Sequence, residues 1–272
     1  MVMTGHYAAP VPEVLEVESY QALAERVVGA RVVAAAADRY AASRLVAPRA
    51  LAEALVGRRV TGTGRRGKLL WLTSDGVTLG MRFGMTGVLL LDGRAGVEGL
   101  LYGPHEYRAA WVRASLTLDD GRTLVLHDPR RLARVELDPS LADLGPDVVG
   151  LSRRDFDAAL ATRGEGPAVK ARLLDQSAIA GIGNLLADEM LFRAGVDPRT
   201  PVGRLDERSR ARLYRALGQT IRTLRRRGGS HTGDHMEARH PDGTCPRDGT
   251  PLRRATVGGR TTYWCPQHQR EL

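Results

Sequence analysis

The hydrophobic pattern of the chain changes partway along, and this change limits the folds that it can adopt. Between Arg31 and about Leu137, short apolar runs such as VTLGMRFG, GVLLLDG and TLVLHDP are separated by Gly and Asp. From Arg153 to about Arg227, apolar residues recur at helical spacing instead. Regular turn signals between alternating runs predict antiparallel strands in a β-sandwich or barrel, and the second pattern predicts helices. The sequence therefore predicts an α+β fold.

Composition indicates a folded protein without a membrane span. Of the 272 residues, 43% are hydrophobic and 26% are charged, as in globular domains. We find no apolar run long enough to cross a bilayer, which needs about 18 residues. The first eleven residues lack the basic start and apolar stretch of a signal peptide. Two cysteines cannot build a disulfide framework, so we expect a cytoplasmic protein.

The positive charge is concentrated at the end of the chain. The net charge is +9, from 40 basic and 31 acidic residues. Residues 199–272 hold 16 Arg and 7 acidic residues, which alone gives +9. A localised cationic surface is typical of a nucleic-acid-binding protein. A solvated surface in an Arg-rich chain (38 Arg against 2 Lys) explains the surplus equally well.

A glycine-rich segment, Ile179–Asn184, joins two of the expected helices. Two glycines in a tight turn let backbone N–H groups approach an anion at the start of the next helix, where Asn184 could cap or donate. This arrangement suits a DNA phosphate. An ordinary turn between helices is the alternative for so short a motif.

The longer string LLDQSAIAGIGNLLADEMLFRAGVDP, residues 173–198, closely resembles the helix–two-turn–helix of the formamidopyrimidine-DNA glycosylase / endonuclease VIII family. Leu15 and Leu132 depart from the family pattern, which has a second proline and an aromatic residue there. Other segments resemble family motifs in order and spacing and extend the similarity over nearly the whole chain beyond residue 11: PEVLEVE (12–18), RGKLL (66–70), FGMTG (83–87), DPRRL (128–132) and VGGRTT (257–262).

The resemblance implies a fold and a domain organisation. A helix is expected over Glu13 to Val28, where apolar residues share one face before Gly29. The three expected domains are an N-terminal β-sandwich with that helix over residues 12–138, a helix–two-turn–helix domain over 139–235, and a zinc-finger-like β-hairpin over 236–272.

The resemblance also implies a bifunctional DNA glycosylase and abasic-site lyase. The secondary amine of Pro12 would attack C1′ of the lesion nucleotide and form a Schiff base. Glu13 would act as general acid or base, although a first-turn helix acid is the plain alternative. Lys68 and Arg260 would hold the lesion-side phosphate and assist β- and δ-elimination.

Pro12 is internal in the sequence as written, so its nitrogen is an amide and not a nucleophile. Val11 directly precedes it, and a GTG codon is read as Val internally but as Met at initiation. We therefore expect the mature chain to begin at Pro12, after removal of an initiator residue at position 11.

Three further side chains are expected to bind DNA. Met85 would wedge into the gap left by an extruded base, and Arg131 would bond the orphaned partner base. Asn184 would complete a phosphate clamp with Lys68 and Arg260. Core packing is the alternative for Met85, and a surface ion pair is the alternative for Arg131.

The family's zinc motif is altered in the tail. Cys245, Asp248, Cys265 and His268 keep the family's spacing, but two of the usual four cysteines are replaced. Zn²⁺ accepts Cys, His and Asp ligands, and His240 could take the place of Asp248. A metal-free hairpin packed around aromatic residues is the alternative. No organic cofactor is expected.

The expected partner is duplex DNA containing oxidised bases or abasic sites, bound by a monomer and away from any membrane. When bound to DNA, the protein would be associated with the nucleoid. The choice between oxidised purines and oxidised pyrimidines stays open. A DNA-damage binder that has lost the reactive amine is the main rival, and an RNA-binding protein is a more distant one.

Overall fold

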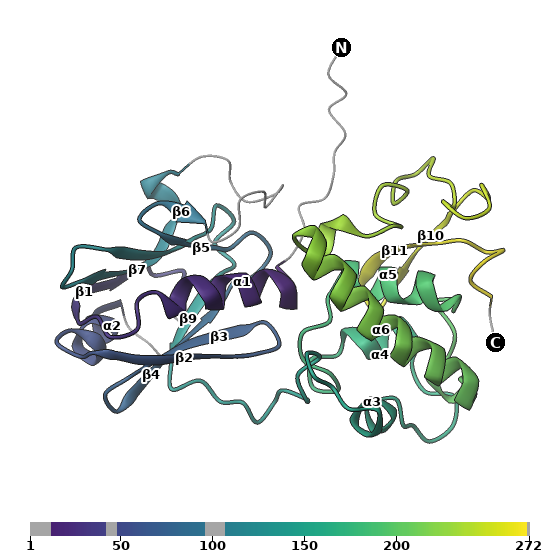
Figure 1. Cartoon of the computed structure of the whole chain (residues 1–272), viewed down its shortest axis with the longest axis horizontal. Helices are drawn as coiled ribbons and strands as arrows, with labels where there is room; N and C mark the ends of the chain where they lie inside the picture. The colour runs from purple at the N-terminus through teal and green to yellow at the C-terminus, as the bar shows by residue number, and fades with distance from the viewer. Residues whose placement is uncertain (1–11, 42–47, 96–106, 271–272) are drawn as a thin grey trace, which may run out of the picture. The chain divides into compact units, whose positions relative to one another are not determined.

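The computed structural model describes residues 12–41, 48–95 and 107–270 (Figure 1). The chain forms two compact units. The unit that we call the sheet unit contains Pro12, Glu18–Arg65 and Leu69–Pro139. The helical unit contains Ser140 onward together with two short earlier segments, Glu13–Val17 and Arg66–Lys68. No helix in the described part of the chain has the length and apolarity that a bilayer crossing requires.

The sheet unit is a β-sandwich of two antiparallel sheets, as the alternating pattern predicts. One sheet has the order β1 (Val32–Ala37), β7 (Val112–Leu118), β8 (Thr123–His127), β5 (Val88–Leu91) and β6 (Arg94–Ala95). The other has the order β2 (Val60–Arg66), β3 (Leu69–Ser74), β4 (Val77–Arg82) and β9 (Arg134–Leu137). Helices α1 (Val14–Glu25) and α2 (Pro48–Leu55) and the 3₁₀ turn η1 (Ala109–Trp111) complete the described elements up to Pro139.

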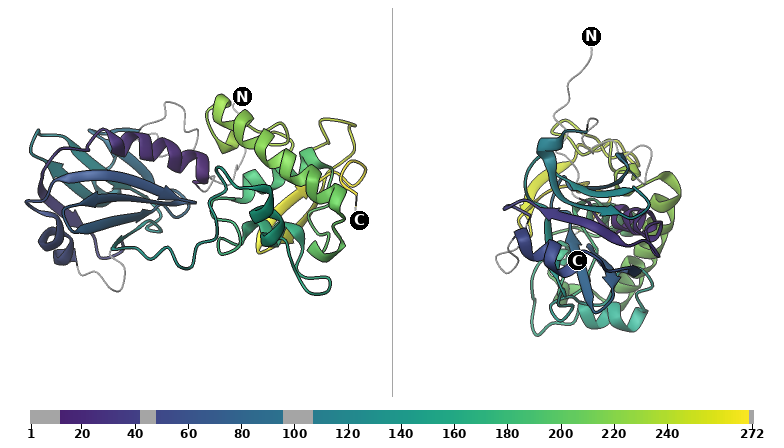
Figure 2. Two further views of the ribbon diagram at one scale, coloured as in Figure 1. Left: turned by 60° about the horizontal axis from the view of Figure 1, so that its bottom comes forward. Right: turned by 90° about the vertical axis from the view of Figure 1, so that its left-hand side faces the viewer.

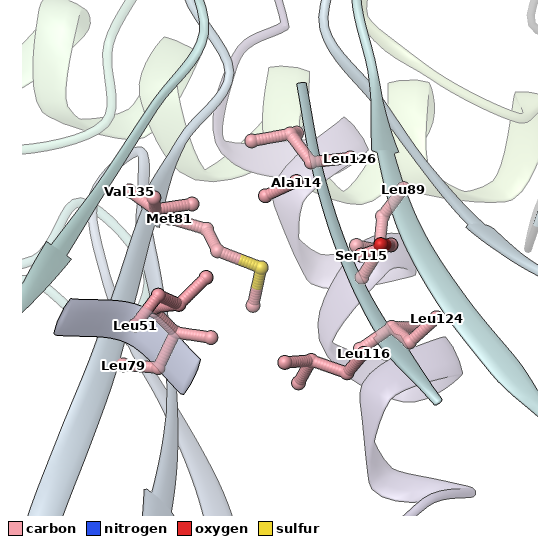
Figure 3. Close-up of a pocket in the computed structure, with 10 residues that line it drawn as sticks. All are labelled: Leu51, Leu79, Met81, Leu89, Ala114, Ser115, Leu116, Leu124, Leu126 and Val135. Atoms are coloured by element: carbon pink, nitrogen blue, oxygen red, sulfur yellow. The ribbon is translucent and has the colours of Figure 1, made fainter. Parts of the chain in front are cut away.

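The two sheets bury a common apolar layer (Figure 3). Met81 and Val135 of the four-stranded sheet face Leu89 and Leu126 of the five-stranded sheet, and Leu51 of α2 covers one side. All five side chains are buried. Because side chains alternate between faces of a strand, each sheet supplies this layer with every second residue.

The helical unit surrounds one central helix, α5 (Asn184–Ala194). Nine of its eleven residues are buried, because it packs against both α6 and β11. The other elements of the unit are α3 (Arg153–Ala159), α4 (Val169–Leu174), η2 (Val202–Arg204), α6 (Glu207–Arg227), η3 (Ser230–Thr232), β10 (Arg253–Val257) and β11 (Arg260–Trp264). Figure 2 shows α6 as the longest helix of this unit. It begins at the Asp206 cap, whose side chain accepts from the Ser209 N–H, and ends at Gly228 in the left-handed conformation.

A buried ion-pair network joins α4, α5 and the segment after η3. Asp188 of α5 lies 2.6 Å from the Lys170 ammonium and 2.7 Å from the Arg239 guanidinium. Lys170 is fully buried and also donates to the Thr262 hydroxyl of β11 at 2.6 Å. One carboxylate therefore forms ion pairs with two cations inside the unit.

We expect Asp188→Ala to destabilise the protein by about 3–5 kcal/mol, because it leaves two buried cations without their counter-ion. Lys170→Met should cost less, since Asp188 keeps its pair with Arg239. Urea unfolding of the two variants measures the difference in the free energy of unfolding. Equal losses would show that the carboxylate is not the centre of the network.

Candidate functional site

The Glu13 carboxylate caps the start of α5. One oxygen accepts the N–H of Leu185 at 2.7 Å, and the other accepts those of Gly183 at 3.1 Å and Leu186 at 3.0 Å. Glu13 is fully buried. These donors are among those that a helix leaves unsatisfied at its N-terminus. A Cβ on Gly183 would lie 2.2 Å from the Glu13 carboxyl carbon, so the carboxylate requires glycine at this position.

Glu16 holds the backbone around Glu13. Its side chain accepts the Glu13 N–H at 2.9 Å, which is one half of a capping box on α1. It also accepts the N–H of Ser230 at 2.7 Å and the Ser230 hydroxyl at 2.9 Å. The segment that follows α6 is thereby fixed beside the start of α1. Pattern analysis of the sequence gave no role to Glu16, although it lies within the quoted N-terminal motif.

The β2–β3 turn carries Lys68 into the helical unit. The N–H of Gly67 donates to Asp147 at 2.6 Å, and the Arg66 side chain donates to the Gly145 carbonyl at 2.9 Å. Gly67 has a φ of 58°, and a Cβ there would lie 2.8 Å from the Gly181 nitrogen. The turn therefore packs directly against the glycine-rich segment before α5, and only glycine fits.

Glu13 and Lys68 perturb each other's ionisation. Burial raises the pKa of Glu13 above its ordinary value, and the neighbouring Glu16 charge adds to this, whereas Lys68 and the backbone N–H donors oppose it. Burial lowers the pKa of Lys68, and the Arg260 charge lowers it further, against the pull of the two glutamates. Such opposed shifts in one place are typical of a proton-transfer site.

Asn184, the first residue of α5, contacts the β10–β11 hairpin, which carries Arg260. The Asn184 side-chain amide donates to the Thr261 carbonyl at 3.2 Å. Arg260, beside Thr261, is exposed, and its charge reaches Lys68. The helix cap that the sequence allowed for Asn184 is supplied by Glu13 instead. The structure thus brings Glu13, Lys68, Asn184 and Arg260 together.

Lys170 supports this hairpin and was missed by the sequence patterns. Its ammonium bonds the Thr262 hydroxyl, adjacent to Thr261. Lys170 and Lys68 are the only two lysines in the chain. The rarity argument that drew attention to Lys68 could have found Lys170 as well.

Pro12 is buried and directly precedes Glu13 in the chain. Val11 lies outside the described residues. The residues that follow Pro12 are held by the hydrogen bonds of Glu13 and Glu16.

Met85 and Arg131 lie on two neighbouring loops of the sheet unit. Met85 is partly exposed in the turn between β4 and β5. A Cβ on Gly84 would lie 2.7 Å from Leu132, so this turn packs against the loop that carries Arg131. Arg131 is exposed, has a φ of 57°, and places its guanidinium 4.4 Å from the centre of the Tyr40 ring. No ion pair holds it among the described residues, and Tyr40 is a contact that the sequence did not suggest.

Buried Asp128 fixes the Arg131 loop. Its carboxylate accepts the N–H groups of Arg130 at 3.1 Å, Leu132 at 2.6 Å and Ala133 at 2.8 Å, and the hydroxyl of Thr86. One side chain thus sets the geometry of both loops. A non-glycine residue held at positive φ and exposed is typical of a functional position.

Three of the four expected zinc ligands come together in the tail. The Cys245 and Cys265 sulfurs and an Asp248 oxygen lie within 4.8 Å of one another. Zn²⁺ accepts these donors, so the group fits a metal with three protein ligands and one open position. The structure does not bring His268 into the group, because its Nε2 lies 2.6 Å from the Phe192 carbonyl. His240, the substitute considered for Asp248, is exposed and also lies outside it.

Two family models match the chain. The formamidopyrimidine-DNA glycosylase N-terminal domain matches residues 11–135, and the formamidopyrimidine-DNA glycosylase H2TH domain matches residues 144–235. Together with the sandwich, the helical unit and the hairpin, these matches define a DNA glycosylase of base-excision repair. The chain belongs to the formamidopyrimidine-DNA glycosylase family, which confirms the resemblance seen in the sequence.

Known proteins agree with this assignment. The formamidopyrimidine-DNA glycosylase of Solibacter usitatus is 31% identical over 279 residues, with 96% of this chain and 100% of the relative covered. The formamidopyrimidine-DNA glycosylase of Thermus thermophilus is 36% identical over 242 residues, with 79% of this chain and 84% of the relative covered. Among solved structures, the Lactococcus lactis Fpg in complex with abasic-site DNA superposes with a TM-score of 0.79 at 22% identity, covering 96% of this chain and 100% of that one. This likeness confirms the α+β fold.

The raised pKa of Glu13 predicts a pH-dependent stability. Because the folded protein holds this proton more tightly than the unfolded chain, the stability that Glu13 contributes is complete below its ordinary pKa of 4.5 and is lost as the pH rises through the raised value. Glu13→Gln cannot titrate. We therefore expect the unfolding free energy of the wild type to fall relative to that of Glu13→Gln across this window. Urea unfolding at a series of pH values measures it, and a constant difference would contradict the shift.

Proposed function

We propose that the protein removes oxidised bases from duplex DNA and then cleaves the strand through abasic-site lyase chemistry. The observation that carries this proposal is the buried Glu13 carboxylate, fixed beside Pro12 with the Lys68 and Arg260 charges close by. Solved structures of the same fold support DNA as the partner, since they are complexes with damaged or abasic-site DNA. The choice between oxidised purines and pyrimidines is a separate question.

The proposed reaction begins at Pro12. Its amine lone pair forms a bond to C1′ while the glycosidic bond breaks and its electron pair leaves with the base, which takes up the proton that the amine loses. Glu13 in its protonated form donates to the sugar ring oxygen, so that the ring opens to an iminium. The raised pKa of Glu13 keeps this proton available nearer to neutral pH.

Strand cleavage follows from the same intermediate. Loss of a C2′ proton expels the 3′ phosphate by β-elimination, and a second elimination releases the 5′ phosphate. Lys68 and Arg260 would stabilise the negative charge on these phosphates, and Asn184 would fix their position.

This chemistry needs Pro12 as a free amine, and we propose that the mature chain begins there. Two observations support it. The match to the family's N-terminal domain starts at residue 11. The Solibacter relative is covered over its full length by 96% of this chain, which leaves about as many residues unmatched as precede Pro12.

Met85 and Arg131 would act on the DNA itself. We propose that Met85 fills the space of the extruded base and that Arg131 donates to its partner base. Their neighbouring loops, fixed by Asp128 and Thr86, support this pairing. The exposed Leu132 beside them supplies apolar bulk without an aromatic face.

Borohydride trapping on duplex DNA with an abasic site tests the proposal. We expect a covalent adduct with a chain that begins at Pro12 and no adduct with the same chain carrying one alanine before it, because an amide nitrogen has no free lone pair. Duplex binding, measured in parallel, should be nearly equal for both. Binding without an adduct in either form would overturn the lyase assignment and favour the catalytically inactive damage binder.

We also propose that the tail binds Zn²⁺ through Cys245, Asp248 and Cys265, with the fourth position filled from solvent. When bound, the ion would fix the hairpin that carries Arg260. Packing also holds the hairpin. Trp264 is buried, and the guanidinium carbon of Arg199 lies 4.7 Å from the centre of its ring.

Elemental analysis of protein purified without chelators tests the metal. We expect stoichiometric zinc in the wild type and its loss in Cys265→Ser. His268→Ala should keep the zinc, because the His268 ring bonds the Phe192 carbonyl instead of the metal group. Absence of zinc from the wild type would leave packing alone as the source of hairpin stability, and loss with His268→Ala would contradict the three-ligand site.

A further inference from the structure

A groove between α6 and residues 148–151 is not used by the DNA-repair chemistry. Its floor is apolar and is formed by Val148, Leu151, Leu217 and Ile221, with Tyr214 at one end. A second depression adjoins it and shares Gln219, Arg222 and Arg225 with the first. The second depression is lined by polar and cationic side chains, with Thr223 and Arg226 completing it. The surface therefore offers an apolar slot that continues into a cationic one.

Gly218 opens the apolar slot. It lies in the interior of α6, a 21-residue helix, where glycine costs about 1 kcal/mol relative to alanine. A Cβ there would meet only the Arg222 side chain, at 3.3 Å. Neither a positive φ nor a close backbone approach requires glycine at this position. Nothing else in the described part of the chain lies within 4 Å of such a Cβ, so the space at Gly218, which lines the groove, is open.

The cations of this face have no acidic counterpart on their own helix. After Glu207 in its first turn, α6 contains no acidic residue. Arg215, Arg222 and Arg226 follow one another at spacings of seven and four, so they line one side of the helix. Among the residues that the structure describes, neither Arg222 nor Arg226 forms an ion pair, whereas Arg227 at the end of the helix binds Asp234 at 2.6 Å.

We propose that this groove binds an acidic peptide segment of a partner protein, with one large apolar side chain in the slot and carboxylates against Arg222 and Arg226. Guanidinium groups bind carboxylates in a bidentate manner, and burial of an apolar anchor adds affinity. The Arg side chains give the surface its charge complementarity. The site is separate from the lesion chemistry and would recruit the enzyme to a protein partner.

The composition of the floor favours a peptide over DNA. Aliphatic side chains do not bind the phosphates of a DNA backbone. The candidate DNA-binding residues Asn184 and Arg260 belong to other elements of the unit. Helix α5 packs between α6 and β11. In Figure 1, α6 lies on the near side of the unit with the hairpin behind it.

Fluorescence polarisation with short labelled peptides tests the proposal. The probes place a run of aspartates beside a leucine or a tryptophan, and matched peptides carry asparagine instead. We expect the full chain to bind an aspartate probe and to lose about tenfold in affinity (about 1.4 kcal/mol) with Arg222→Glu. Gly218→Leu should abolish binding, because it fills the slot while favouring the helix.

The control is Arg208→Glu, which makes the same charge change on an exposed residue of α6 outside the groove. This variant should bind the probes nearly as the wild type does. Equal losses with Arg208→Glu and Arg222→Glu, or no preference for aspartate over asparagine probes, would overturn the proposal. A fall in duplex affinity with Arg222→Glu and no change in peptide binding would assign the groove to DNA instead.

Discussion

The capping of α5 by Glu13 is the interaction on which the rest of the site depends. Three backbone N–H groups converge on one carboxylate from far away in the sequence. A closed fit of this kind admits no side chain at Gly183, and the neighbouring Gly181 accommodates the Lys68 turn in the same way. The glycine-rich segment is therefore shaped by protein groups, and the N–H groups at the start of α5 that the sequence pattern offered to a phosphate bind the Glu13 carboxylate instead.

The positions of the two lysines can be explained by the different response of lysine and arginine to burial. Arginine stays charged under almost all conditions, whereas burial lowers the pKa of lysine readily. The chain has only two lysines, and both lie in the helical unit where burial lowers the pKa. Lys170 forms an ion pair with Asp188 and donates to the hairpin at Thr262. Lys68 lies beside a glutamate whose pKa moves the other way, which suits a group that exchanges protons.

The sequence predicted the fold better than it predicted the contacts of the site. Hydrophobic period is local, so the sandwich strands and the helices could be predicted directly, although α1 ends at Glu25 and not at Val28. The N-terminal motif predicted that Glu13 belongs to the site. It could not predict that Glu13 caps a helix some 170 residues away in the sequence. Local rules favoured Asn184, the residue at the helix start. The orientation of His268 likewise depends on the Phe192 carbonyl, which no spacing rule contains.

A bound anion would change the pKa values of Lys68 and Glu13. Lys68 and Arg260 repel each other, and this repulsion contributes to the depressed pKa of Lys68. A phosphate between them would screen the repulsion and raise that pKa, so the ammonium form would gain stability when DNA is in place. A nearby phosphate would raise the pKa of Glu13 as well, because it further disfavours the charged carboxylate. Under the proposed mechanism, bound DNA would favour protonation of both groups, which is the state that ring opening would require of Glu13 and that phosphate binding would require of Lys68.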